Sequence, residues 1–266
     1  MLVNVQGKRQ DLRLLLFDLD GTLLTSGKKI SSASLKAIRE YQNQGVMVGI
    51  STSRGETMCL DYIDQLHPEI IIASAGAIVR YRGEMIYLAE FSPEETRKMI
   101  AAAREIGGGE IEITVDTIDE HFWNYHVDPE VAYKGWGSTT YSDYRNFDLP
   151  SLKTCIQFTD DQQAKALADR FPDADYARFS DITWYKYTPR SANKEAAIQK
   201  VLEAAKIETD NIMSFGDDYT DIGMLQVSGI GVAMGNAIPE VKTAADVVIG
   251  TNDEDSIAAF LNTIRV

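Results

Sequence analysis

The sequence predicts an α/β fold in which a doubly wound parallel sheet is interrupted by an insert of another type. Short apolar runs such as Leu14–Phe17 alternate with stretches of helical spacing, which is typical of parallel strands covered on both faces. This alternation stops near Gly83 and returns from Ala192. We therefore expect a Rossmann-like core, residues 1–82 and 189–266, and an inserted α+β domain, residues 83–188.

The first core segment is defined by apolar runs and by the residues that end them. Three continuous runs predict buried strands: Leu14–Phe17, Val46–Ile50 and Ile70–Ala73. After the first strand, Ser31 or Ser32 can cap a helix that ends by Gly45. A second helical stretch is expected to end near Leu66. Strands alternating with helices in this way predict a parallel sheet.

The insert has the signals of antiparallel pairing. Tyr81–Glu84 predicts a hairpin turn, and Ser92 with Glu95 forms a capping box for a helix that stops at Gly107–Gly109. Strict alternation over Glu110–Val115 predicts a strand with one buried face. The remaining expected elements are strands at His121–His126, Thr154–Phe158 and Thr183–Tyr187, and a helix at about Asp161–Phe171.

The last core segment repeats the strand and helix alternation. The expected elements are a helix over Lys194–Ala205, strands at Ile212–Phe215, Gly229–Ala233 and Asp246–Ile249, and helices after Asp217, after Pro239 and at the end of the chain. Two halves of one α/β unit thus bracket the insert.

Composition excludes several classes of partner. The chain has 266 residues, with 26 Lys and Arg against 40 Asp and Glu, so its formal net charge is −14. This balance argues against nucleic acid, because phosphate backbones require clustered cations. No run approaches the roughly 20 apolar residues of a membrane helix. With only two cysteines and no secretion signal, we expect a cytoplasmic protein.

Polar loops follow three of the predicted parallel strands, at Asp18, Thr52 and Asp217. Ligands of open α/β sheets bind outside the carboxyl ends of the strands, so these loops can converge. Asp18 and Asp20 share one tight turn, and Asp217 and Asp221 begin a helix.

So many carboxylates at one place require a cation, because like charges raise one another's pKa and oppose ionisation. Hard oxygen ligands of this kind suit Mg²⁺. Lys194, at the start of a predicted helix, would add a second positive charge.

These residues resemble the four ordered motifs of the haloacid dehalogenase superfamily, which here are Asp18–Thr22, Thr52, Lys194 and Gly216–Asp221. The segment Gly231–Ala237, followed by Ala244–Asp246, resembles the Cof-type phosphatase branch. That branch carries a large α+β cap between its second and third motifs, which is where the insert lies.

The resemblance implies a role for each motif residue. Asp18 would be the nucleophile that takes the phosphoryl group, and Asp20 the general acid for the leaving alcohol and then the base for water. Mg²⁺ would be held by the Asp18 carboxylate, the Asp20 backbone carbonyl and Asp217, with Asp221 supporting them. The phosphate oxygens would meet the Leu19 amide, Thr52, the Ser53 amide, Lys194 and Thr220. For Asp221 a simpler interpretation is a carboxylate favoured by a helix dipole.

The chain departs from the branch at three positions. Ser53 stands where Gly is usual, Thr220 where Asn is usual, and Ala75-Gly76 where Asn-Gly is common. None of these changes touches the nucleophile, the acid or the metal ligands, so we expect activity to be kept and phosphate affinity to be affected.

Leaving-group contacts are expected from Arg54 and from the cap. The cap candidates are His121, His126 and the segment Lys134–Trp136. For Arg54 a surface salt bridge is the alternative.

The predicted function is a Mg²⁺-dependent phosphatase of small phosphorylated metabolites, with sugar phosphates favoured by the resemblance. The alternatives are a pyridoxal-phosphate or nucleotide phosphatase, a phosphomutase, and a non-catalytic phospholigand sensor. The expected partner is a small-molecule phosphate ester, with neither nucleic acid nor membrane, and the chain is expected to be a monomer or a weak homodimer.

Overall fold

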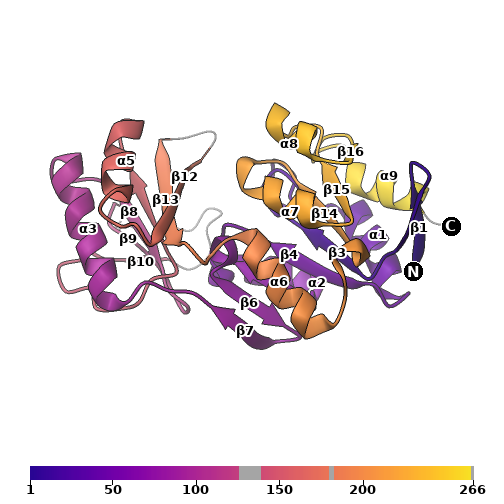
Figure 1. Ribbon diagram of the computed structural model, residues 1–266, viewed down its shortest axis with the longest axis horizontal. Helices are drawn as coiled ribbons and strands as arrows, with labels where there is room; N and C mark the ends of the chain where they lie inside the picture. The colour runs from indigo at the N-terminus through magenta and orange to yellow at the C-terminus, as the bar shows by residue number, and fades with distance from the viewer. Residues whose placement is uncertain (126–138, 180–182, 265–266) are drawn as a thin grey trace.

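The computed structural model describes residues 1–125, 139–179 and 183–264, and these residues form two sheets side by side (Figure 1). The larger sheet has eight strands and the smaller has six, and a separate hairpin lies at the N-terminus. The N-terminus lies at the end of the larger sheet that is remote from the smaller one (Figure 1).

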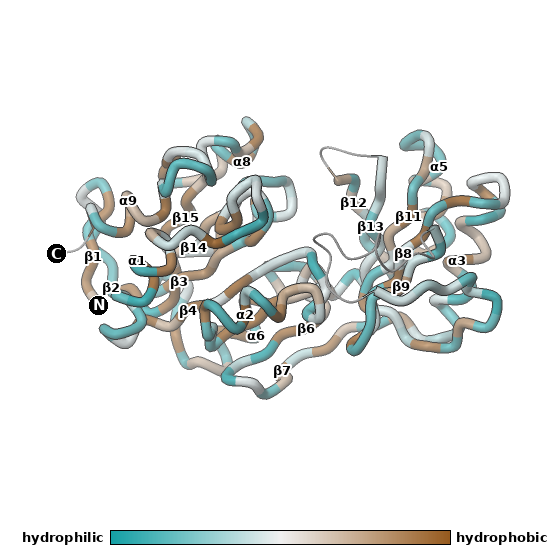
Figure 2. Tube along the Cα trace, turned by 180° about the vertical axis from the view of Figure 1, so that it is seen from behind, coloured by the Kyte–Doolittle hydropathy of each residue, from teal (hydrophilic) through white to brown (hydrophobic). Residues whose placement is uncertain are grey.

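The larger sheet is parallel except at one edge. In spatial order its strands are β16 (Val247–Val248), β15 (Ile230–Ala233), β14 (Ile212–Gly216), β3 (Leu14–Phe17), β4 (Met47–Ser51), β5 (Ile70–Ala73), β6 (Ile78–Tyr81) and β7 (Glu84–Leu88). The six from β16 to β5 run parallel, and β6 runs antiparallel to both of its neighbours, β5 and β7. β3 is buried on both faces, which explains its uninterrupted apolar sequence, drawn brown in Figure 2.

Helices cover both faces of this sheet. The helices are α1 (Ser32–Gln42), α2 (Leu60–Leu66), α6 (Lys194–Ala205), α7 (Ile222–Val227), α8 (Pro239–Ala244) and α9 (Ser256–Thr263). α1, α2 and α9 pack in one apolar cluster with Leu15 and Phe17, whereas α6, α7 and α8 pack in another with Leu14 and Leu16. The expected doubly wound sheet is confirmed.

The smaller sheet is mainly antiparallel. In spatial order it contains β10 (Thr140–Tyr141), β9 (His121–Trp123), β8 (Ile113–Asp116), β11 (Lys153–Gln157), β13 (Trp184–Pro189) and β12 (Ala174–Arg178). The helices α3 (Pro93–Gly107) and α5 (Asp161–Ala168) cover one face, where they pack against Ile113, Val115 and Ile156. The predicted capping box of Ser92 and Glu95 begins α3. The opposite face carries polar side chains toward the larger sheet.

The chain passes between the sheets after β7 and again after β13. The predicted hairpin at Tyr81–Glu84 is confirmed, with positive φ at Arg82 and Gly83. The boundary expected at residue 83 divides this hairpin, and β7 on its far side belongs to the larger sheet. The strand pattern alone did not indicate which sheet β7 would join.

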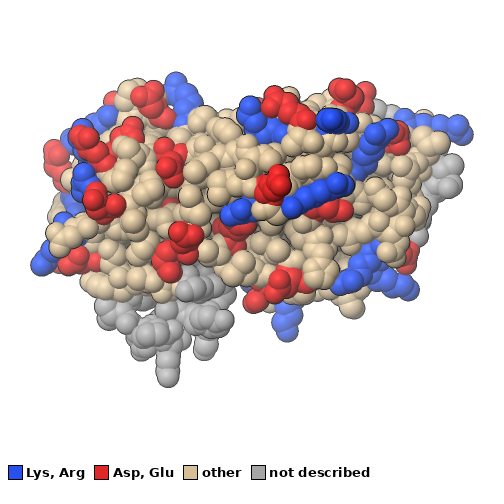
Figure 3. Space-filling model, turned by 90° about the horizontal axis from the view of Figure 1, so that it is seen from below, with Lys and Arg blue, Asp and Glu red and all other residues tan. Residues whose placement is uncertain are grey.

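Four strands were not predicted from the sequence: β1 (Leu2–Val5) and β2 (Lys8–Asp11), which form the N-terminal hairpin, the strand β12, and the two-residue strand β10. The 3₁₀ helices of the described chain span Glu56–Cys59, Ser74–Gly76, Thr209–Asn211 and Tyr219–Asp221. Within the described residues, no helix has the length and apolarity that a bilayer crossing requires. On the face shown in Figure 3, acidic and basic side chains are interspersed.

Candidate active site

Asp18 directly follows β3, at the carboxyl end of the strand, and its side chain is buried. The ammonium of Lys194, the first residue of α6, donates to Asp18 Oδ1 at 2.8 Å, to the Ser51 carbonyl at 2.7 Å and to Asp221 Oδ1 at 2.5 Å. Burial raises the pKa of Asp18 well above its ordinary value, although the charge of Lys194 opposes this. Burial lowers the pKa of Lys194, but the two carboxylates outweigh it and hold the ammonium charged.

Asp221 shapes the loop that follows β14. Its Oδ2 accepts hydrogen bonds from the amides of Asp217 and Asp218, at 3.0 and 3.1 Å. A Cβ atom on Gly216 would lie 2.4 Å from the Asp221 Cβ, so the close approach requires glycine there. Asp221 is almost fully buried and bonded through both oxygens, so its place is set by specific contacts and not by a helix dipole alone.

Asp217 reaches back to the turn after β3. The Thr22 hydroxyl donates to Asp217 Oδ1 at 2.7 Å. Gly21 has a φ of +80°, and a Cβ atom there would lie 2.2 Å from Asp217 Oδ2. Burial raises the pKa of Asp217 to about 7, with the charge of Asp221 adding to the rise and the Thr22 hydrogen bond opposing it. The positive φ of Gly21 and its close approach to the Asp217 carboxylate both require glycine at this position of the turn.

Three carboxylates meet at this point. Oxygens of Asp18, Asp217 and Asp221 lie within 4.8 Å of one another. Asp18 and Asp217 each keep one oxygen beyond the hydrogen bonds described above. The pKa values of Asp18 and Asp217 are raised, as is expected when carboxylates crowd together without a cation. Carboxylate oxygens are hard donors, so this group could hold a metal ion.

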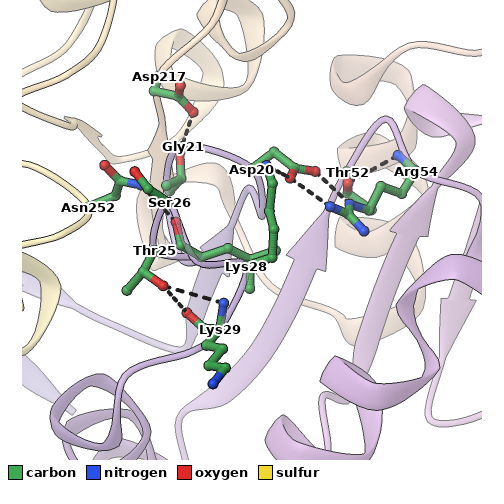
Figure 4. A network of polar contacts seen from close by, with 12 residues as sticks. Asp20, Gly21, Thr25, Ser26, Lys28, Lys29, Thr52, Arg54, Asp217 and Asn252 are labelled. Atoms are coloured by element: carbon green, nitrogen blue, oxygen red, sulfur yellow. Dashed lines mark hydrogen bonds and ion pairs between the residues drawn. The ribbon is translucent and has the colours of Figure 1, made fainter. Parts of the chain in front are cut away.

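Asp20 lies in an ion-pair network beside this cluster (Figure 4). Arg54 donates from Nε to Asp20 Oδ2 at 2.6 Å and from Nη2 to Oδ1 at 2.8 Å, and Lys28 Nζ donates to Oδ1 at 2.7 Å. Burial raises the pKa of Asp20, but Arg54 and then Lys28 lower it to about 2. The Arg54 side chain is only 4% exposed, so this pair is buried on the arginine side and is not the surface salt bridge considered from the sequence.

The loop after β4 supplies the expected phosphate-binding residues. Thr52 is buried, and its Oγ1 accepts a hydrogen bond from the Arg54 amide at 3.1 Å. The Ser53 carbonyl accepts a hydrogen bond from Lys153 Nζ of β11 at 2.5 Å. This contact joins the loop to the smaller sheet.

The other predicted phosphate contacts lie around the same strand ends. Leu19 is fully buried in the core, and its carbonyl accepts hydrogen bonds from the Thr22 and Leu24 amides, which closes the turn after β3. Thr220 lines a pocket of about 200 Å³ together with Lys194. The structure thus brings all of the predicted core residues to one edge of the larger sheet.

The predicted cap candidates have a different outcome. His121 is buried, and its Nδ1 bonds to Asp116 Oδ1 within the smaller sheet. Asp116 also pairs with Lys153 Nζ at 2.8 Å. The candidates His126 and Lys134–Trp136 lie outside the described residues.

Sequence reasoning missed four charged residues at the site: Lys28, Asp116, Lys153 and Lys186. Lys186 had a detectable signal, because a lysine at the centre of the aromatic strand Trp184–Thr188 requires one polar face on that strand. Lys153 had none, since it lies at the first residue of its strand.

A family model described as haloacid dehalogenase-like hydrolase matches residues 15–261, which is nearly the whole chain. The chain belongs to this hydrolase family. The order of the motifs and the geometry above agree with that membership.

Two bacterial relatives align with this hydrolase over nearly their whole length. The 5-amino-6-(5-phospho-D-ribitylamino)uracil phosphatase YcsE of Bacillus subtilis is 30% identical over 264 residues, covering 96% of this chain and 97% of the relative. The pyridoxal phosphate phosphatase YbhA of Escherichia coli is 26% identical, with 94% and 97% covered.

Solved structures share the fold. A haloacid dehalogenase-like hydrolase from Bacteroides thetaiotaomicron has a TM-score of 0.81 at 24% identity and covers 94% of this chain and 98% of its own. The sugar phosphatase BT4131, described as a member of subclass IIB, has the same TM-score, identity and coverage.

Proposed function

We propose that this chain is a Mg²⁺-dependent phosphatase that hydrolyses small phosphorylated metabolites, with sugar phosphates as the favoured class. The observation that supports this most is the meeting of Asp18, Asp217 and Asp221 at the carboxyl ends of β3 and β14, where Lys194 bonds to Asp18 and Asp221. Phosphoryl transfer requires mainly positioning and neutralisation of charge, and this group of side chains supplies both.

In the proposed reaction Asp18 attacks phosphorus through one carboxylate oxygen, and the bond to the ester oxygen breaks. Asp20 gives its proton to the leaving oxygen, which departs as an alcohol. Asp20 then takes a proton from water, the water oxygen attacks the aspartyl phosphate, and inorganic phosphate leaves with Asp18 restored.

We assign the metal site to the side chains of Asp18 and Asp217 and to the backbone carbonyl of Asp20. All three are hard oxygen donors, which fits Mg²⁺. When bound, Mg²⁺ neutralises the carboxylates and the phosphate oxygens. Asp221 holds the loop of Asp217 in place, because its own oxygens accept bonds from Lys194 and from two backbone amides.

We assign the phosphate contacts to the Leu19 and Ser53 amides, the Thr52 hydroxyl, Lys194 and Thr220. All three N–H groups of Lys194 are engaged, by Asp18, Ser51 and Asp221. A phosphate oxygen that lies against Asp18 would therefore replace one of these three groups as a hydrogen-bond acceptor of Lys194. The segment that carries the smaller sheet would act as the cap, because its polar face reaches the Ser53 loop through Lys153.

The test of this proposal is hydrolysis of p-nitrophenyl phosphate with Mg²⁺ present and after chelation. We expect activity that chelation abolishes and that Asp217→Ala largely removes even at raised Mg²⁺. Folded protein with no hydrolysis would favour the phospholigand sensor.

The substrate class is tested by phosphate release from a panel. The panel contains sugar phosphates, nucleoside monophosphates, pyridoxal phosphate and the phosphorylated ribitylaminouracil named for the Bacillus subtilis relative. Isomerisation of a sugar phosphate without phosphate release would indicate a phosphomutase.

A further inference from the structure

Lys186 lies on the polar face of the smaller sheet, the face that is turned toward the site. Its neighbours in the strand, Tyr185 and Tyr187, pack on the opposite side in the apolar cluster under α3 and α5. In register, Lys186 pairs with Cys155 of β11 and with Ala177 of β12. Because side chains alternate along a strand, Lys186 projects away from the apolar cluster.

Within residues 1–125, 139–179 and 183–264, this buried lysine has no carboxylate in contact with its ammonium, unlike the other two lysines nearby. It is 8% exposed, and toward the described part of the chain its ammonium makes one long hydrogen bond, from Nζ to the Ser53 hydroxyl at 3.4 Å. Lys153 pairs with Asp116 at 2.8 Å, and Lys194 pairs with Asp18 and Asp221. Among the described residues, Lys186 makes no ion pair with any carboxylate.

Burial of an unpaired ammonium is costly, because the charge loses its hydration and gains no partner. Burial, followed by the charges of Lys194 and Lys153, lowers the pKa of Lys186 to about 8. A hydrophobic side chain of similar length would fit this position at less cost. The Lys186 side chain therefore has the features of a residue that binds a ligand and not of one that stabilises the fold.

Lys186 also lines the pocket that contains Lys194 and Thr220. The lining of this pocket includes Lys194, which contacts the nucleophile, and the exposed residues Tyr176 and Tyr219. Asp175 lines it too, but this carboxylate lies 3.5 Å from Arg190. A ligand whose phosphoryl group meets Asp18 and Lys194 would thus have its remaining part beside Lys186.

We propose that Lys186 binds a second anionic group of the substrate, a carboxylate or a second phosphate on the leaving-group part. This inference rests on the proposed phosphatase function and narrows its substrate class to phosphate esters that carry such a group. The Ser53 hydroxyl accepts the long hydrogen bond from the ammonium, and the anion would take its place.

The test uses binding of phosphonates, so it does not depend on turnover. Calorimetry with Mg²⁺ compares 3-phosphonopropionate with propylphosphonate, which has the same chain length and no carboxylate. Ethylenebisphosphonate replaces the carboxylate with a phosphonate and shows which anion is preferred. The wild type should bind at least one of the two probes that carry a second anionic group about 10- to 100-fold more tightly than propylphosphonate, the scale of a hydrogen bond to a charged group.

The variant Lys186→Met should lose this preference and keep its affinity for propylphosphonate, and Lys186→Arg should retain most of the preference. The matched control is Lys165→Met, which removes a cap lysine from the outward helix α5, where Lys165 pairs with Asp169. This control should keep the wild-type preference.

Several results overturn the inference. The wild type could bind all three probes with equal affinity. The Lys186→Met variant could retain the preference for a second anion, or it could lose affinity for all three probes to the same extent. The melting temperature of Lys186→Met gives a separate readout, and it should stay the same or rise. A clear fall would show a structural role and would also overturn the inference. If no ester is hydrolysed but the binding preference is present and is lost in Lys186→Met, the phosphatase proposal fails, and Lys186 binds the second anionic group of a ligand that is not hydrolysed.

Discussion

Arg54 holds both carboxylate oxygens of Asp20, at 2.6 Å from Nε and 2.8 Å from Nη2, and Lys28 adds a third bond. The guanidinium is itself fixed, because it is buried and lies 5.7 Å from the centre of the Tyr62 ring. Asp20 with a pKa of about 2 carries almost no proton near neutral pH. If Asp20 is the general acid, this ion pair must open or weaken during catalysis.

We therefore predict that Arg54→Gln changes the relative rates at which esters with different leaving groups are hydrolysed. A return of the Asp20 pKa from about 2 toward its ordinary value near 4 would raise the protonated fraction about 10- to 100-fold. The ratio of alkyl phosphate to p-nitrophenyl phosphate hydrolysis, measured as kcat/KM, should rise about tenfold, because p-nitrophenolate leaves without a proton.

The control for this prediction is Arg80→Gln. It breaks a comparable pair with Glu56, 2.7 Å away, without contact to Asp20, and should leave the ratio unchanged. A fall in the ratio for Arg54→Gln would instead assign Arg54 to substrate binding.

The departure at Ala75 has a cost that can be measured. Ala75 has a φ of +61°, between Ser74 at +49° and Gly76 at +104°. Left-handed backbone is unfavourable for a residue with a Cβ. Ala75→Gly should raise the free energy of unfolding by about 0.5–1 kcal/mol, measured by urea denaturation.

The neighbouring Ala77 provides the control. It is fully buried with a φ of −70°, so Ala77→Gly should lower the free energy of unfolding by about 1 kcal/mol. Destabilisation by both substitutions would show that the left-handed turn is not strained.

The buried pair of Lys153 and Asp116 should be important for stability. Asp116 is 1% exposed and is bound by Lys153 and His121. Lys153→Met leaves this carboxylate without its main cation and should cost about 3–5 kcal/mol, measured by denaturation at pH 7. The double variant with Asp116→Asn should recover part of the loss, and a purely additive double variant would argue against the pairing.

The same pair predicts a pH dependence. Burial raises the pKa of Asp116, but Lys153 and then His121 lower it below its ordinary value. A carboxylate with a lowered pKa stabilises the fold above the unfolded pKa near 4, and this contribution is lost as the pH falls through the folded pKa. The gap in melting temperature between the wild type and Lys153→Met should therefore narrow on acidification below about pH 4.

The sequence was sufficient for the core because its signals are local. The apolar run ending at Asp18 and the one ending at Gly216 fix two parallel strands, and the carboxyl ends of parallel strands lie at one edge of the sheet. The meeting of Asp18, Asp217 and Lys194 follows from that topology together with the motif order. The capping box of Ser92 likewise depends on residues three apart.

The smaller sheet was less predictable because its polar contacts join distant strands. Lys153 and Ser53 are 100 residues apart and meet only because the two sheets face each other. The orientation of His121 also depends on a partner, Asp116, that lies in the neighbouring strand. The packing between the two sheets decides which polar face of the smaller sheet meets the larger sheet. The periodicity within one strand does not encode this packing.

The roles of Asp18 and Asp20, the two aspartates of the turn after β3, can be distinguished by the substrates that each variant still cleaves. Asp18→Asn removes the proposed nucleophile, so no aspartyl phosphate should form from any ester. Asp20→Asn keeps the nucleophile and the backbone carbonyl but loses the proton donor and base, which should cost about 10²–10⁴ in rate for each step that needs them.

Stopped-flow measurements should show the difference. Since p-nitrophenolate leaves without a proton, Asp20→Asn should keep a burst of p-nitrophenol followed by slow turnover, because water then attacks without a base. With a sugar phosphate, whose alkoxide must be protonated, the same variant should release almost nothing. Asp18→Asn should show neither burst nor turnover with either substrate. A burst from Asp18→Asn and none from Asp20→Asn would reverse the two assignments, because the residue that forms the covalent intermediate is the one whose loss removes the burst.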